Sequence, residues 1–224
     1  AKDGGDFRKN LPEPGSPKTP NIVIPFAADA AIKADGSIDE DVWKKSLGIA
    51  MDENKVPEWH FFGSHVVDGK RLNDEGANFW LLATKAGLAI VAEVQNGKPE
   101  VVTEKADWYG GDCVELFTDV ENKGGKPTKQ LFMAYKRANV DRAAASENGI
   151  QIGRAKLENG YLLEALIPWE ALGFKSVPEG EFGIEFQLDF GRKGAGRVLQ
   201  MTYGTGTNEA WIKSDKFMKA KVGK

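Results

Sequence analysis

The sequence predicts an all-β protein, an antiparallel β-sandwich of about eight to ten strands with one short helix near residues 38–46. Three observations support this fold class. Short segments alternate between apolar and polar residues, the pattern of strands with one buried face. The 26 glycines and 10 prolines favour many turns, and 12 Phe, 6 Trp and 4 Tyr favour strands. A chain of 224 residues that is 41% hydrophobic can bury a substantial core.

The N-terminal part divides into a tail and the start of one domain. Residues 1–20 hold four prolines and no apolar period, which predicts a flexible tail or linker. A single domain is then expected over residues 21–224. Its helix follows Ser37, a residue type that caps helix starts, and Glu40 completes a capping box. Val42 and Trp43 are expected to fix this helix against the sheet.

Strands dominate from Asn78 onward. Gly87 in Lys85-Ala86-Gly87 is expected in a tight turn between the strands at 79–84 and 88–95. Gly124-Gly125 is expected in the turn between the strands at 113–120 and 129–135. The alternation is clearest in the strand from Phe182, where Phe182, Ile184 and Phe186 are expected on one face. Glu185 and Gln187 are expected on the other face of the same strand. The predicted strands are Phe79 to Thr84, Leu88 to Gln95, Cys113 to Val120, Lys129 to Tyr135, Tyr161 to Ile167, Phe182 to Phe190, Arg197 to Tyr203 and Lys216 to Val222.

Charge and hydropathy exclude two classes of partner. The formal net charge is −3, which gives no electrostatic basis for binding a phosphate backbone, so no nucleic-acid partner is expected. No run of about 18 apolar residues occurs, and no membrane span is expected. A single cysteine excludes an internal disulfide framework and a Cys-based zinc cluster.

The residues also argue against catalysis. The two histidines, His60 and His65, lie in a poorly patterned stretch and match no metalloprotease spacing. A glycosidase needs a close pair of carboxyl groups, and no pair stands out. We expect the strand acids to lie on solvated faces and Cys113 to be a small core residue. The acids considered are Asp112, Glu115, Asp119, Glu164, Glu185 and Asp189.

Two tryptophans are placed unusually. Trp108 lies in a glycine-flanked polar loop before one strand, and Trp211 lies in a similar loop before the last strand. An indole face stacks on the C–H groups of a pyranose ring while nearby amides and carboxylates bind its hydroxyls. The alternative, that each indole folds back as a lid on the sandwich, is equally compatible with the composition. Trp43, Trp80 and Trp169 lie in apolar contexts and are expected in the core.

Several motifs in a shared order resemble a family 9 carbohydrate-binding module. The resemblance extends from about Ile22 to Val222, with an expanded segment at residues 51–78. The motifs are Ile32 to Trp43, Trp108 to Asp119, Gly160 to Trp169, Phe182 to Asp189, and Asn208 to Trp211 closing on Lys216-Phe217.

The resemblance implies a non-catalytic module, usually attached to secreted bacterial polysaccharide-degrading enzymes, that holds a terminal sugar between two tryptophans. By position, the sugar-binding residues are Trp108, Trp211, Glu115 and Asn208, with Tyr109 and Asp112 as further contributors. Phe132 and Ala134 stand where sugar-binding members carry an Arg and an Asn, which removes two donors.

The resemblance also sets the expected partners. No cofactor is required, although structural calcium is implied, with Asp119 and Glu121 as candidate ligands. The expected partner is a sugar or polysaccharide chain end, bound by a monomer that is secreted, periplasmic or at the cell surface.

Two alternatives stay open. Related sandwiches in electron-transfer systems hold a b-type haem between the sheets, and Met133, Met201 and Lys136 are conceivable axial ligands here. The second alternative is a cell-surface interaction domain with no small ligand, which would use the sandwich edge or the expanded segment.

Overall fold

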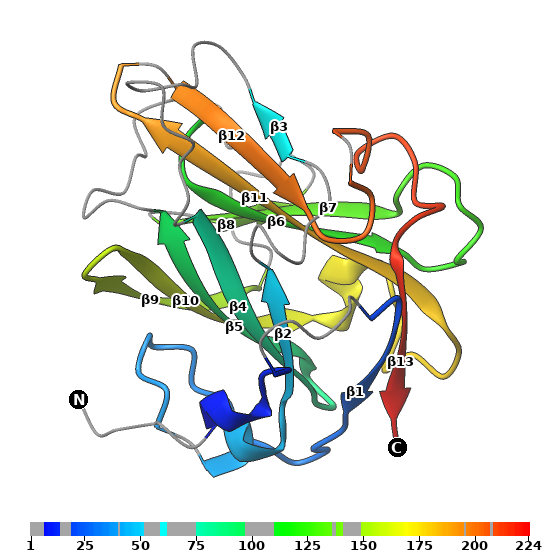
Figure 1. Cartoon of the computed structure of the whole chain (residues 1–224). Coiled ribbons are helices and arrows are strands. Elements are labelled where there is room, and N and C mark those ends of the chain that lie inside the picture. Colours follow the sequence, from blue (N-terminus) through cyan, green and yellow to red (C-terminus); the bar gives the residue numbers. More distant parts are fainter. Residues whose placement is uncertain are drawn as a thin grey trace.

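The computed structural model describes residues 7–13, 19–39, 41–51, 59–61, 75–96, 110–135, 138–140, 149–194, 196–206 and 208–224. Thirteen strands in these ranges form two layered sheets (Figure 1), so the predicted β-sandwich is confirmed. The strands exceed the eight to ten expected because several of them are only three to seven residues long and carry little alternation.

The larger sheet, sheet A, has eight strands. It has the order β1-β13-β11-β6-β7-β8, and β12 pairs with both β11 and β3. Neighbours are antiparallel except β1 and β13, which are parallel. Its strands are β1 (Asn21–Pro25), β3 (Trp59–Phe61), β6 (Cys113–Asp119), β7 (Lys129–Ala134), β8 (Ala138–Val140), β11 (Phe182–Arg192), β12 (Gly196–Thr202) and β13 (Met218–Gly223).

The second sheet, sheet B, is a five-stranded antiparallel sheet with the order β2-β4-β5-β10-β9. The pairing of β5 and β10 is regular, from Gly160 opposite Gln95 to Pro168 opposite Gly87. Its strands are β2 (Leu47–Met51), β4 (Glu75–Ala83), β5 (Gly87–Asn96), β9 (Gln151–Leu157) and β10 (Gly160–Pro168).

The core lies between the sheets and follows the period-two pattern of the strands. Phe182, Ile184, Phe186, Leu188 and Phe190 all point inward from β11 and are buried. Across the interface, the Phe79 ring from sheet B stacks on Phe186 at 4.3 Å between centroids. Burial of these apolar side chains holds the two layers together.

Helical structure in the described residues is limited to short 3-10 turns. The expected helix near residues 38–46 is a turn, η2 (Asp41–Lys45), which begins three residues later than the capping pattern suggested. Asp35 rather than Ser37 organises the preceding backbone, because its Oδ1 accepts the Ser37 N–H at 2.9 Å. Trp43 is buried on the outer face of sheet B, as expected. None of the described helices has the length and apolar character needed to cross a membrane.

Part of the expected flexible tail packs on the domain. Residues Phe7–Asn10 form the turn η1, whose Phe7 is buried with its ring 4.8 Å from that of Trp80. The Asn10 Nδ2 donates to the Ser46 carbonyl oxygen at 2.8 Å. A side chain at Gly48 would collide with this segment, since a Cβ there would lie 2.3 Å from the Asn10 oxygen. Residues 7–13 therefore belong to the folded domain.

Candidate functional site

A polar pocket lies over the outer face of sheet A, the face of β6, β7, β11 and β12 that points away from the core. Its volume is about 430 Å³, within the range of about 300 to 1,000 Å³ typical of small-molecule sites. Its walls combine amide, charged and indole side chains. They are Glu115, Lys126, Gln130, Gln187, Arg197, Gln200, Asn208 and Trp211.

The alternation of the strands brings the floor together. Residues at odd positions of β6 and β11 face outward, and the register places Glu115 directly opposite Gln187. Gln200 on β12 lies opposite Asp189. These polar side chains therefore share one face of three adjacent strands.

A β-bulge aims Arg197 at the same face. The pairing of β11 with β12 runs from Phe190 opposite Leu199 to Gly191 opposite Arg197, which leaves Val198 as the extra residue. Without that extra residue, a strict period of two would place Arg197 on the core face with Leu199. The bulge instead puts the guanidinium over the polar face, where Nη1 lies 3.0 Å from the Asp189 Oδ1.

The floor is a connected hydrogen-bond network. The Gln187 Nε2 donates to the Glu115 Oε1 at 2.8 Å, and the Gln200 Nε2 donates to the Gln187 Oε1 at 2.7 Å. The Gln130 Nε2 donates to the other Glu115 oxygen. Each of these side chains is held by its neighbours, so the floor is preorganised for a ligand.

Two carboxyl groups of the floor, those of Glu115 and Asp189, are buried and have raised pKa values. Glu115 and Asp189 are 1% and 0% exposed, which contradicts the expectation that strand acids are solvated. Desolvation and then the charge of Asp189 raise the pKa of Glu115 well above its ordinary value. Desolvation also raises the pKa of Asp189, but hydrogen bonding to Glu115 and the charge of Arg197 oppose that rise. Burial thus raises the pKa of both carboxyl groups in the floor.

The other strand acids are buried because backbone from elsewhere in the chain covers them. Glu185 accepts N–H groups from Tyr203 at 2.9 Å and from Gly204 at 2.7 Å, and the Thr205 N–H also bonds to it. Glu164, on the outer face of sheet B, accepts the Asp35 and Gly36 N–H groups, each at 3.0 Å. Buried carboxylates of this kind fix loops rather than perform chemistry.

The segment after β12, described over residues 203–206 and 208–217, contributes Asn208 and Trp211 to one wall of the pocket and is fixed at both ends. Glu185 holds its start. Further along, the Ser214 Oγ donates to the Asp119 Oδ2 at 2.6 Å, and the Ser214 N–H donates to the Gly125 oxygen at 2.9 Å. Ala210 is fully buried in a cluster with Phe117 and Phe217. These contacts place the segment beside the β6–β7 turn (Figure 1).

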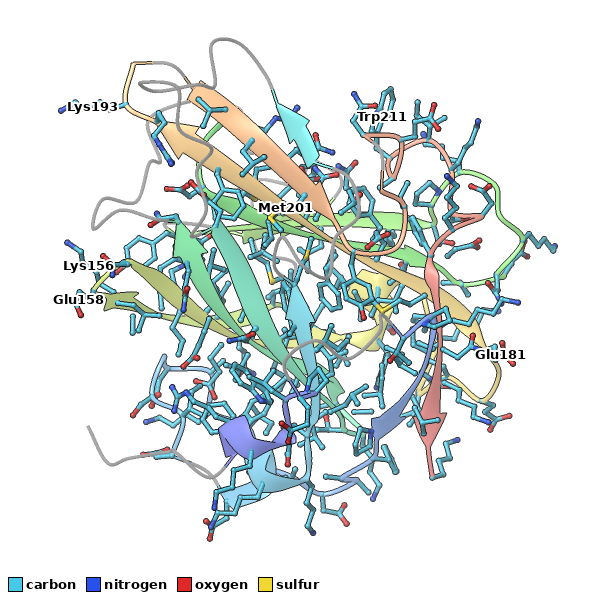
Figure 2. The ribbon with its side chains drawn as sticks, in the orientation of Figure 1. Lys156, Glu158, Glu181, Lys193, Met201 and Trp211 are labelled. Carbon is cyan, nitrogen blue, oxygen red and sulfur yellow. The ribbon has the colours of Figure 1, made fainter. Side chains whose placement is uncertain are left out.

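A single helical turn orients the two predicted site residues of this segment. The Lys213 N–H donates to the Glu209 oxygen at 2.9 Å, and the Ile212 N–H donates to the same oxygen at 2.8 Å. Asn208 and Trp211 are three residues apart, a spacing that brings side chains together on a helical turn. Both line the pocket, and the Trp211 indole is 53% exposed. Figure 2 shows Trp211 at the outer edge of the molecule.

The structure thus brings together Glu115, Asn208 and Trp211 from the predicted set. Trp108 and Tyr109 lie outside the described residues, so their place relative to Trp211 stays a prediction. Asp112 is buried elsewhere, where its Oδ1 accepts the Gly191 N–H at 3.0 Å and its Oδ2 accepts from Asn96.

Several lining residues were not predicted from the sequence. Gln130, Gln187 and Gln200 are visible as polar positions within alternating strands, a signal that is also typical of an ordinary solvated face. Arg197 faces the pocket only because of the bulge in β12. Lys126 reaches the pocket only because of the path of the turn between β6 and β7. Phe132 and Ala134 pack with Cys113 on the outer face of sheet A.

The candidate calcium ligands do not form a cage. The Asp119 Oδ2 accepts from Ser214 and, at 3.1 Å, from the Gly124 N–H, while Glu121 pairs with Lys123 at 2.9 Å. No group of three or more His, Cys, Asp or Glu able to hold a metal occurs within the described ranges. These two residues do not fit the six to eight oxygen ligands of calcium. Structural calcium stays a prediction from the family resemblance.

The haem alternative gains no support from the two methionines. Met133 and Met201 are 1% and 0% exposed and pack in the core between the sheets, with Met201 labelled in Figure 2. Lys136, the third conceivable ligand, lies outside the described residues.

A second cavity, of about 530 Å³, lies at the β1–β13 edge of sheet A and lacks an aromatic wall. It is lined by Pro20, Asn21, Ile22, Val23, Glu181, Lys219 and Lys221. The pocket beside Trp211 is the better candidate because it combines an exposed indole with preorganised polar groups.

A β-sandwich with a shallow pocket of amides and charges beside an exposed indole defines a ligand-binding module. A profile of the family described as "Carbohydrate family 9 binding domain-like" matches residues 35–222, and the chain belongs to this family. The family consists of non-catalytic carbohydrate-binding modules, so the chain is not an enzyme.

Solved structures agree with this fold. A carbohydrate-binding module of family 9 from Caldicellulosiruptor kristjanssonii in complex with cellotriose is 21% identical, with a TM-score of 0.66 over 88% of this chain and 92% of that one. A family 9 module from the same organism in complex with glucose is 20% identical, with a TM-score of 0.67 over 88% and 94%. No curated protein sequence matches the chain.

Proposed function

We propose that this chain binds a terminal sugar of a polysaccharide in the pocket over sheet A, with the ring stacked on Trp211. The supporting observation is the half-exposed indole next to a floor of linked amide and carboxyl groups. Trp108, which precedes β6 in the sequence, is proposed as the second stacking surface. The sugar ligands of the two similar structures, cellotriose and glucose, are consistent with this class of ligand.

The chemistry of the pocket suits a sugar better than an apolar ligand. A pyranose presents C–H groups on its faces and hydroxyls around its edge, so it needs one aromatic surface and several fixed donors and acceptors. Asn208 and Gln130 supply amide groups beside the indole. We expect dissociation constants between millimolar and micromolar, because a shallow site buries little ligand surface.

Calorimetric titration with a panel of monosaccharides and oligosaccharides tests this function. Trp211→Ala is expected to lower the affinity about tenfold, since an aromatic contact contributes about 0.5 to 1.5 kcal/mol beyond area burial. Trp108→Ala is expected to lower it by a similar factor. Ile212→Ala is the matched control, because Ile212 is 42% exposed on the same turn but does not line the pocket. Sugar binding that is indifferent to both tryptophans would refute the assignment.

Location and oligomeric state follow as proposals from this function. A module that recognises polysaccharide is useful where polysaccharide is present, so we infer a secreted, periplasmic or surface location. We also infer a monomer. Immunoblots of cell fractions and light scattering of the purified chain test the two statements.

A further inference from the structure

The strand β11 continues past the end of β6, and on that side its last residues are held by side chains. The pairing of β11 with β6 ends at Asp189 opposite Cys113, two residues before Gly191. The Gly191 N–H donates to the Asp112 Oδ1 at 3.0 Å in a buried hydrogen bond. The Asp112 carboxylate therefore supplies the acceptor that a longer β6 backbone would have supplied.

The Asp112 carboxylate is itself fixed from sheet B. Its Oδ2 accepts from the Nδ2 of Asn96, the last residue of β5, at 3.2 Å. Asp112 and Asn96 are 1% and 0% exposed. A buried carboxylate with a donor on each oxygen is held in one orientation, so the Gly191 N–H is tied to both sheets.

The carbonyl group of Gly191 is held as well. The Arg192 Nη1 donates to the Gly191 oxygen at 3.0 Å, and the Arg192 Nη2 lies 2.6 Å from the Oε1 of Glu75 on β4. The Glu75 side chain is 1% exposed, so this ion pair is anchored in the interior. Both polar groups of the Gly191 backbone thus bond to side chains that are fixed in place.

Gly191 is also the residue at which the register of β11 and β12 shifts. Phe190 lies opposite Leu199, whereas Gly191 lies opposite Arg197. The bulge that turns Arg197 toward the pocket therefore begins at the residue that Asp112 holds. A bulge bends its strand and disrupts the ladder locally, so the bent path needs partners other than the neighbouring strand.

We propose that Asp112 is a positioning residue of the sugar pocket, because its bond to Gly191 at the bulge keeps Arg197 on the pocket face of β12. This inference rests on the proposed function, which makes the pocket a sugar site. Asp112 is buried and is not one of the residues that line the pocket, whereas Arg197 is. Asp112 therefore acts through Arg197 and not by contact with the ligand, as the sequence had led us to expect.

The side chains next to the bulge would respond differently to its loss. In a regular ladder Gly191 would pair with Val198, and Val198 would turn from the core to the outer face of sheet A. Leu199 would stay opposite Phe190 on the core face. Val198 and Leu199 are now 7% and 0% exposed and belong to the core between the sheets.

Thiol labelling of these two positions measures the register without any ligand. Val198→Cys and Leu199→Cys are each made in a Cys113→Ala chain, which has no other cysteine. Adding Asp112→Ala is expected to speed the labelling at position 198 severalfold and to leave the labelling at position 199 unchanged. A general loosening of the fold would speed both.

Calorimetric titration of the same full chain measures the effect on the site. The probe is the sugar that binds the wild type most tightly in the panel of the proposed function, starting with glucose and cellotriose. We expect Asp112→Ala to lower the affinity about tenfold at a temperature where the variant is folded, since a displaced wall loses its contact with the ligand. Asp112→Asn keeps one oxygen for its two donors and should have a smaller effect of the same kind, which covers a failure of the alanine variant to fold. Glu164→Gln changes another buried carboxyl group that accepts two backbone N–H groups, on sheet B, and should leave both readouts unchanged.

The outcomes separate this inference from the proposed function. Unchanged labelling at position 198 would mean that the adjacent hairpin turn, where Gly194 and Gly196 both have a φ of 75°, sets the bulge alone, and would overturn the role of Asp112. Faster labelling at both positions would overturn it too, as would a lost bulge with unchanged sugar affinity, and either result leaves the carbohydrate site intact. A wild type that binds no sugar would overturn the proposed function and the place of Asp112 in it, while the labelling still reports whether Asp112 holds the bulge.

Discussion

At the scale of single residues, the behaviour of the site depends on whether Glu115 is charged. Its two oxygens accept hydrogen bonds from Gln130 and Gln187, which suit either protonation state. Desolvation raises the pKa of Glu115 most, the charge of Asp189 on β11 raises it further, and the charge of Arg197 on β12 opposes the rise. Cys113 on the same strand is itself buried and has a raised pKa, so it adds no charge near neutral pH.

This arrangement predicts a pH-dependent stability. Because the pKa of Glu115 is raised in the folded state, the folded protein binds this proton more tightly than the unfolded chain does. The stabilising effect is complete below the unfolded pKa of about 4.3 and is lost as pH rises through the folded pKa. We therefore expect the free energy of unfolding to be lower at pH 8 than at pH 5.5, as measured by urea denaturation.

Glu115→Gln tests the origin of that dependence. The amide is neutral at every pH and can still donate to Asp189, so the variant should lose less stability than the wild type between pH 5.5 and pH 8. The two proteins differ only at this carboxyl group, so the difference between their pH profiles reports the ionisation of Glu115 together with its effect on the pKa of Asp189. Parallel profiles would show that Glu115 ionises normally in the folded chain.

At the scale of elements, the strands were predictable where alternation is long. β10 and β11 follow a period of two over nine and eleven residues, and both were placed correctly from the sequence. Five strands, β1, β2, β3, β8 and β9, were not predicted. β9 is amphipathic only weakly, and β1 holds three apolar residues next to a proline-rich segment. β1 and β9 are strands because they pair with β13 and β10, respectively, and not because of a pattern in their own residues.

The bulge in β12 shows why the site was only partly predictable. From sequence, Arg197 alternates with Val198 and Leu199 as in any strand, and nothing marks the position where two residues will oppose one. Trp211 and Asn208 were recognisable because a large indole in a polar loop is unusual. Arg197 and Lys126 gain their place only from the register of β12 and the path of the β6–β7 turn.

The segment that carries Trp211 depends on one carboxylate beneath it. Glu185→Gln replaces an acceptor oxygen by an NH2 group facing the backbone N–H groups of Tyr203, Gly204 and Thr205. We expect the variant to lose about 2 to 3 kcal/mol of stability, because buried donors lose a charged acceptor. Hydrogen exchange should speed up in residues 203–217, and the affinity for sugar should fall with it.

Glu164→Gln is the matched control for this prediction. Glu164 is equally buried and also accepts two backbone N–H groups, but it lies on sheet B, away from the pocket. It should lower stability without changing sugar affinity or exchange in residues 203–217. Equal losses of affinity in both variants would mean that Glu185 acts only through global stability.

At the scale of the whole molecule, the outer faces of the two sheets differ. Sheet A presents the pocket, whereas the outer face of sheet B is apolar and covered by segments from the N-terminal part of the chain. Trp43, Trp80, Leu82 and Val91 are buried there. The composition predicted a sandwich, but it did not reveal that a proline-rich N-terminal region would cover one of its faces, because Phe7 is a single apolar residue in a polar context.

This division predicts that stability and ligand binding can be separated by one substitution far from the pocket. Phe7→Ala removes a buried ring that meets Trp80 edge-on, and Phe-to-Ala changes in cores cost about 3 to 5 kcal/mol. We expect a loss at the lower end of that range in urea denaturation, because a turn at the chain end can partly rearrange. The affinity for sugar at a temperature where the variant is folded should match the wild type, because sheet B and the inter-sheet core lie between Phe7 and the pocket. A change of affinity in the folded variant would mean instead that the two outer faces are coupled through the core.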